Sequence, residues 1–233
     1  MRDVRLLLPA LLVALLLVVS VALPRGDRAG AGAAAAAHGG PAYRLPASGA
    51  DASRPPLPAS ASAPLRFAPT VAASDQQAVR DAVAAARPEA RRLVELVAGL
   101  VTVSVGSPGR GVAGLMRTAP GGAYSVMLDL GPVYRANGLA GVRRLVLHEL
   151  AHVVDHALVS PALQRELDAA TPVGFGCDDN GLSGACAARE ERFAESFAKW
   201  ATGDIGVNIN LGYRVPPPRS LEHWGDPLAA LHR

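Results

Sequence analysis

The fold is decided by residues 141–159, which read GVRRLVLHELAHVVDHALV. Apolar residues cover most of the circumference of this segment when it is wound as an α-helix of period 3.6. A helix that is apolar on nearly every side is buried and does not lie on a protein surface. Pro161 follows closely and is typical of a helix end. The sequence therefore predicts a long helix in the centre of the folded domain.

Three polar residues interrupt this helix in an HExxH pattern: His148, Glu149 and His152. Positions i and i+4 lie on one helix face, so both imidazoles can reach one metal ion. Glu149 lies about 100° further round the helix, where a general base for a zinc-bound water would stand. Unpaired polar groups are costly in an apolar helix, which favours a functional reason for them. The alternative is a core helix whose histidines bond to backbone or water.

A catalytic zinc takes a third protein ligand, and the same helix offers Asp155 and His156. Both lie about a turn too far along the helix to join His148 and His152 on one ion. No glycine between Glu149 and Val159 would break the helix and bring them back. We therefore expect the third ligand from elsewhere, and we expect Asp155 to orient a ligand imidazole by a hydrogen bond.

The predicted helix at residues 187–202 carries two glutamates one turn apart, Glu191 and Glu195, with Phe193 and Phe197 roughly opposite. One carboxylate can bind the metal while the other accepts a hydrogen bond from a ligand imidazole. The spacing alone does not say which glutamate is the ligand. The alternative is a solvated acidic face on a helix that packs through its phenylalanines.

The HExxH helix ending in Val-Val-Asp, followed by Glu-x-Phe-Ala-Glu-x-Phe, resembles the gluzincin metallopeptidases. The segment from 124 to 199 is most similar to the catalytic-domain family of anthrax lethal factor. The resemblance implies that Glu191 is the third zinc ligand and that Glu195 is its hydrogen-bonding neighbour. It also implies that residues 124–130 form the edge strand beside which a peptide substrate would add as a further strand.

The chain departs from that family in one respect, because relatives place a tyrosine shortly before the ligand glutamate. This chain has Gly184, Ala185 and Cys186 there. We expect Tyr213 or His223 to supply the missing donor to the oxyanion. Zinc would then polarise the scissile carbonyl, and Glu149 would move the proton from water to the leaving amine. The alternatives are a catalytically inactive zincin-like binding protein of the cell envelope and a structural zinc site closed by four ligands.

The N-terminus predicts export from the cytoplasm. Arg2 and Arg5 precede an apolar run that continues to residue 23, which is typical of a signal peptide and long enough to be a membrane anchor. Either reading makes the protein extracytoplasmic, secreted or anchored to the cell membrane. Cys177 and Cys186 flank a run of turn-forming residues, and outside the cytoplasm we expect a disulfide between them, with free thiols as the alternative.

Composition and patterning predict one folded domain in a chain of 233 residues. The net charge of +3 implies no nucleic-acid partner. Residues 24–65 are rich in alanine, proline and glycine and read as a disordered linker. We expect an α+β, zincin-like domain over 66–226, in which a small twisted sheet packs on the active-site helix and the second ligand-bearing helix, followed by a tail, 227–233. The expected strands are 65–68, 100–105, 124–130 and 207–211, and the other expected helices are 74–87 and 89–97.

Overall fold

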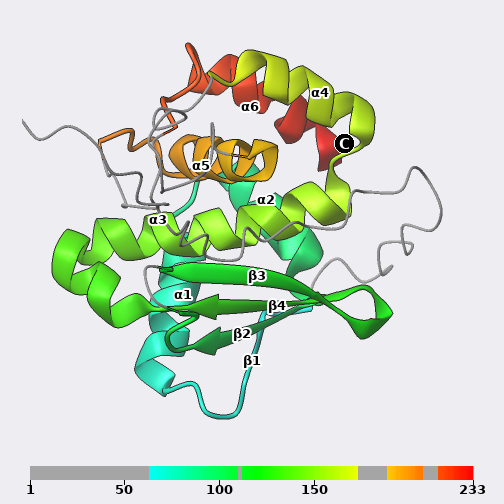
Figure 1. The fold of residues 1–233 in the computed structure, drawn as a ribbon. Coiled ribbons are helices and arrows are strands. Elements are labelled where there is room, and N and C mark those ends of the chain that lie inside the picture. Colours follow the sequence, from blue (N-terminus) through cyan, green and yellow to red (C-terminus); the bar gives the residue numbers. More distant parts are fainter. Residues whose placement is uncertain (1–62, 110–111, 173–187, 207–214, 233) are drawn as a thin grey trace, which may run out of the picture. The chain divides into compact units, whose positions relative to one another are not determined.

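A computed structural model describes residues 63–109, 112–172, 188–206 and 215–232 (Figure 1). These all lie in the second of the two units into which the chain divides, His38–Arg233. Among the described residues, no helix is both long and apolar enough to cross a membrane. Several predictions fall outside the described residues: the N-terminal segment 1–23, most of the linker, the strand at 207–211, Tyr213, and the pair Cys177 and Cys186.

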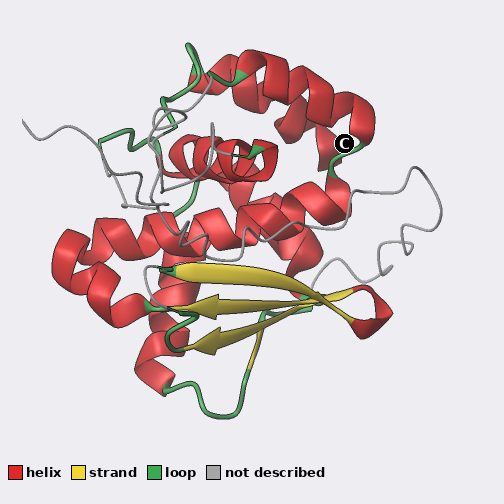
Figure 2. Ribbon diagram, in the orientation of Figure 1, coloured by secondary structure: helices red, strands yellow, loops and turns green. Residues whose placement is uncertain are grey.

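The described part of the chain is α+β, with a four-stranded mixed sheet and six α-helices (Figure 2). The predicted fold class is thereby confirmed at this level. The strands are β1 (Arg66–Phe67), β2 (Val101–Val105), β3 (Gly114–Ala119) and β4 (Ala123–Leu128). The helices are α1 (Ala73–Ala84), α2 (Pro88–Ala98), α3 (Leu130–Leu158), α4 (Pro161–Ala170), α5 (Arg189–Thr202) and α6 (Leu221–Ala229).

The strand order in the sheet is β1-β2-β4-β3, in which β2 lies parallel to β1 and β4, and β3 lies antiparallel to β4. The strand predicted at 124–130 is thus bonded on both sides, because Tyr124 pairs with Val101 of β2 and with Thr118 of β3. The expectation that it forms the sheet edge is wrong. The edge strand near the site is β3, which the sequence analysis missed because a glycine and an arginine interrupt its apolar pattern.

The predicted central helix is observed as the longer part of α3, which begins earlier than expected, at Leu130. The two parts of α3 meet at Gly138, whose φ of 63° and ψ of −157° break the helix and favour glycine at that position. From Gly141 to Asp155 nearly every side chain is buried. This part of α3 packs against the sheet through β3 and β4 and against α5 on another side, as Figure 1 shows. The core of the described part therefore surrounds α3.

Two short helices occur where the sequence analysis assigned no helix. α4 begins after Ser160, whose hydroxyl accepts a hydrogen bond from the Leu163 N–H, and Pro161 occupies its first position. α6 begins after Ser220 in the same way, with the His223 N–H as donor. Both serines are typical helix caps, and the sequence analysis used neither of them.

Candidate active site

The residues of the predicted metal site converge from two helices. His148 and His152 lie on α3, and Glu191 lies in the first turn of α5. Glu191 Oε2 is 3.1 Å from His148 Nε2 and 3.5 Å from His152 Nε2. One ligand atom from each of the three residues lies within 4.8 Å of the others. In the described part of the chain, His148, His152 and Glu191 thus form a cluster of potential metal ligands, the metal group. Its two imidazoles and one carboxylate are a donor set that zinc prefers.

The electrostatics of the site also suit a cation. Burial alone would lower the pKa of His148, but hydrogen bonds with Glu191 and Glu195 and the negative charges of Glu191 and Glu149 outweigh it and raise the pKa to about 10. Burial would raise the pKa of Glu191, but the positive charge of His152 and hydrogen bonds from both histidines hold it well below its usual range. The protein thus stabilises positive charge where a metal ion would sit. The side chain of Glu191 is 34% exposed, which leaves the site a path to solvent.

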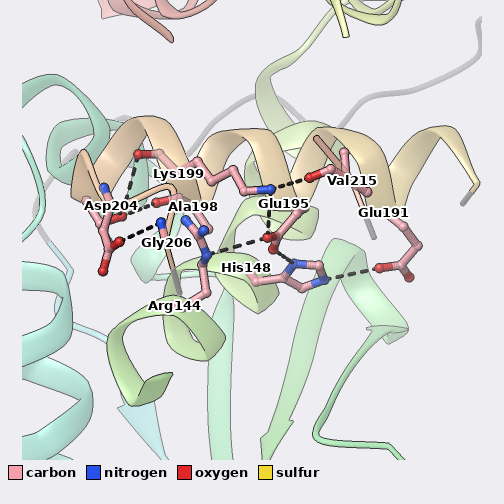
Figure 3. Close-up of polar contacts among 10 residues, drawn as sticks. Arg144, His148, Glu191, Glu195, Ala198, Lys199, Asp204, Gly206 and Val215 are labelled. Carbon is pink, nitrogen blue, oxygen red and sulfur yellow. Dashed lines mark hydrogen bonds and ion pairs between the residues drawn. The ribbon is translucent and has the colours of Figure 1, made fainter. Parts of the chain in front are cut away.

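Behind His148 lies a buried group of charges, shown in Figure 3. His148 Nδ1 is 3.4 Å from Glu195 Oε2. Glu195 Oε1 is 3.5 Å from Arg144 Nε and 3.1 Å from Lys199 Nζ. Lys199 also donates a hydrogen bond to the Val215 carbonyl. Because Glu195 faces Nδ1, the Nε2 atom of His148 is turned towards Glu191, which is the orientation that a metal ligand needs.

His148 and the two cations together keep Glu195 ionised. Burial raises the pKa of this carboxyl, but the hydrogen bond with His148 and the charges of Arg144 and Lys199 outweigh it and lower the pKa. The sequence analysis did not identify either cation as part of the site. A signal was present, because Arg144 lies one turn before His148 in the same apolar helix and Lys199 is the only lysine of the chain.

Glu149 lies beside the metal group and is 4% exposed. Its side chain packs against the backbone of Gly114 on β3, so it occupies the space between α3 and the edge strand. Burial raises the pKa of Glu149, partly offset by the positive charges of His148 and His152. A carboxyl with a raised pKa can both take and give a proton nearer neutral pH, as a general base must.

Asp155 is fully buried and has a different role from the predicted one. Its Oδ1 accepts hydrogen bonds from Gln164 and Arg189, each at 3.2 Å, and its Oδ2 accepts one from Arg189 at 2.6 Å. Arg189 is the first residue of α5, two positions before Glu191. Asp155 therefore joins the end of α3 to α4 and to the start of α5, and these contacts replace the expected one with a ligand imidazole.

The remaining candidate residues lie apart from the metal group or outside the described residues. The ring of His156 lies 6.4 Å from that of Tyr124, away from His148 and His152, in agreement with the helix geometry. His223 is exposed in the first turn of α6, where it lines a hollow with Pro172 and Pro218. The structure does not bring it to the metal group. Because Tyr213 is not described, the donor to an oxyanion stays a prediction.

Comparisons with protein-family models, with curated proteins and with solved structures found no match to this chain. The class of the protein is therefore defined by its own geometry. It is an α+β protein in which a buried His-x3-His pair and a glutamate from a second helix form a candidate metal site, consistent with an HExxH, zincin-like centre.

Proposed function

We propose that this protein is a zinc metallopeptidase that acts outside the cytoplasm, an endopeptidase of the gluzincin type. The single observation that carries the proposal is the convergence of His148, His152 and Glu191 beside the buried carboxyl of Glu149. A structural zinc would need four protein ligands, whereas a catalytic zinc uses three and keeps one position for reaction. The described residues supply three ligands together with a neighbouring base.

The chemistry divides between the ion and the protein. Zinc bound by the three ligands would supply Lewis acidity, which polarises a carbonyl group and makes water nucleophilic near neutral pH. Glu149 takes the proton of the attacking water and delivers it to the leaving amine. Glu195 fixes the ring of His148, and Arg144 and Lys199 keep Glu195 charged for that purpose. Each protein group therefore has one task, which a substitution can remove separately.

The open edge of the sheet supports a peptide as the substrate. The Ala113 carbonyl accepts a hydrogen bond from the Asp129 N–H, so the odd-numbered residues of β3 bond to β4. The N–H and C=O groups of Gly114, Met116 and Thr118 then point to the other side, where no described strand pairs with β3. An extended peptide could add there as a fifth strand and would pass next to Glu149.

The N-terminal residues 1–23 and the two cysteines complete the proposal. A signal peptide or membrane anchor would place the domain outside the cytoplasm, where Cys177 and Cys186 would form a disulfide. The substrate would then be a protein or peptide in that compartment.

The test compares the purified full chain with a Glu149→Gln variant, which keeps the shape of the side chain but removes the base. Zinc content is measured by elemental analysis, and cleavage of a mixed peptide library is followed by mass spectrometry. We expect about one zinc per chain in both proteins and a loss of cleavage of about 100-fold or more in the variant. Zinc in both proteins without cleavage by either would contradict a peptidase and favour a zincin-like protein that binds a partner.

A further inference from the structure

We propose that Gly114 is a positioning residue for Glu149: the missing side chain at this position of the edge strand makes the space that the Glu149 carboxyl occupies. The inference rests on the proposed function, because it assigns a task to a residue beside the same base. It adds to the site a residue of β3, an element separate from the two helices that carry the candidate metal ligands.

The geometry at Gly114 leaves no room for a side chain. A Cβ atom added there would lie 2.2 Å from Glu149 Oε1, 2.5 Å from Cδ and 2.6 Å from Cγ. All three distances are shorter than any contact that a real Cβ atom makes. The clash includes Cγ, so the Glu149 side chain could not avoid it by turning its carboxylate alone and would have to adopt another rotamer.

Glycine is not required here by the backbone. Gly114 is not among the glycines with positive φ, and a glycine inside a strand ordinarily lowers stability. A glycine at such a position often marks the close approach of another group. Here that group is Glu149, so the requirement for glycine is one of space.

The strand at Gly114 cannot easily move aside. Gly114 pairs with Leu128 in β4, and the hydrogen bond from the Asp129 N–H to the Ala113 carbonyl, 2.8 Å long, fixes the strand just before it. Glu149 lies on the buried part of α3 and is 4% exposed. An alanine at position 114 would therefore displace the carboxylate of Glu149 and leave the strand in place.

The consequence for the reaction follows from where Gly114 lies. Its backbone groups point to the open edge of β3, and its side-chain face touches Glu149. One residue thus sets the separation between the base and a peptide bound at that edge. A displacement of about 1 Å in such a group can cost about 100-fold in rate.

The test uses the purified full chain and four variants: Gly114→Ala, Glu149→Ala, the double variant with both changes, and Gly131→Ala as control. A Cβ at Gly131 would meet only the end of the Arg135 side chain at 3.5 Å, an ordinary contact. Urea unfolding of the metal-free proteins measures how the contact between positions 114 and 149 changes the free energy of unfolding. Zinc titration and steady-state peptide hydrolysis measure its effect on the site.

We expect Gly114→Ala to lower the urea midpoint in the parent but to leave it unchanged or raised in the Glu149→Ala background, where the space is free. We also expect Gly114→Ala to bind zinc within about threefold of the parent and to lose about 100-fold in kcat with little change in KM. The Gly131→Ala control should match the parent in zinc binding and hydrolysis.

An equal loss of stability in both backgrounds, or a parent-like kcat in Gly114→Ala, would overturn the inference. Failure of the proposed function would look different. In that case the parent itself would not cleave peptides, while the dependence of the urea midpoint on Glu149 would still report the contact between Gly114 and Glu149.

Discussion

Replacing Arg189 with methionine should weaken the fold more than its partly exposed position indicates. Arg189 is 27% exposed, but the Asp155 carboxylate that it binds is 0% exposed. Without Arg189, Asp155 keeps only the hydrogen bond from Gln164 among the contacts described for it. Removing one partner of a buried ion pair costs about 3–5 kcal/mol. Because water can reach the space that Arg189 leaves, we expect a smaller cost than this, about 2–3 kcal/mol.

The assay is urea unfolding followed by circular dichroism, with two comparisons. Adding Asp155→Asn to Arg189→Met should recover about 1 kcal/mol or more, because the uncompensated charge is gone. Arg192→Met should cost less than Arg189→Met, since its partner Asp168 is 35% exposed. A cost below about 0.5 kcal/mol for Arg189→Met, or no recovery with Asp155→Asn, would refute the view that this pair joins α3 to α5.

Three further predictions concern the metal group. Glu195→Gln should weaken zinc binding about 10- to 100-fold, because His148 loses its charged neighbour; isothermal titration would show no change if Glu195 were only structural. The metal-free protein should be most stable between pH 4.5 and 6.5 in urea unfolding. His148 has its pKa raised from 6.5 to about 10, so its contribution is complete below pH 6.5 and disappears as the pH rises through 10. Glu191 has its pKa lowered from 4.5, so its contribution is present above pH 4.5 and disappears as the pH falls through the lowered value. Stability that did not fall as the pH rose from 6.5 through 10 would contradict the His148 assignment, and stability that did not fall on acidification below pH 4.5 would contradict the Glu191 assignment. Removal of zinc by a chelator should lower the free energy of unfolding by about 2.7 kcal/mol relative to protein in a solution whose free zinc concentration is about 100 times Kd. An unchanged urea midpoint would exclude a zinc ion that binds only the folded state.

The sequence predicted the parts of the site that lie within one regular element. The pair His148 and His152 could be placed on one face because α-helix geometry fixes the relation of i and i+4. Glu191 and Glu195 could be placed on one helix face for the same reason. Which of them faces both histidines depends on how α5 packs on α3, and the structure shows Glu191 at the Nε2 atoms and Glu195 at Nδ1 of His148.

The errors in the sequence analysis arise where tertiary contacts decide. The edge of the sheet was assigned to residues 124–130 because the family resemblance implied it, and β3 was missed because its sequence, GLMRTA, has no clear alternation. Its glycine is explained only by Glu149, a residue distant in sequence. Asp155 was assigned to a ligand imidazole from its place on the helix, but it binds Arg189, which only packing brings near. Local periodicity could not predict either contact.

The central claim is that His148, His152 and Glu191 bind a zinc ion together, and zinc titration of the metal-free full chain tests it most directly. Equilibrium dialysis at pH 7.5 should give about one zinc per parent chain. His148→Ala, His152→Ala and Glu191→Ala should each lose that zinc, while His156→Ala, one turn further along α3, should keep it. No bound zinc in the parent, or zinc that remains in all three ligand variants, would contradict the claim and would leave the group as a buried network of histidines and carboxylates.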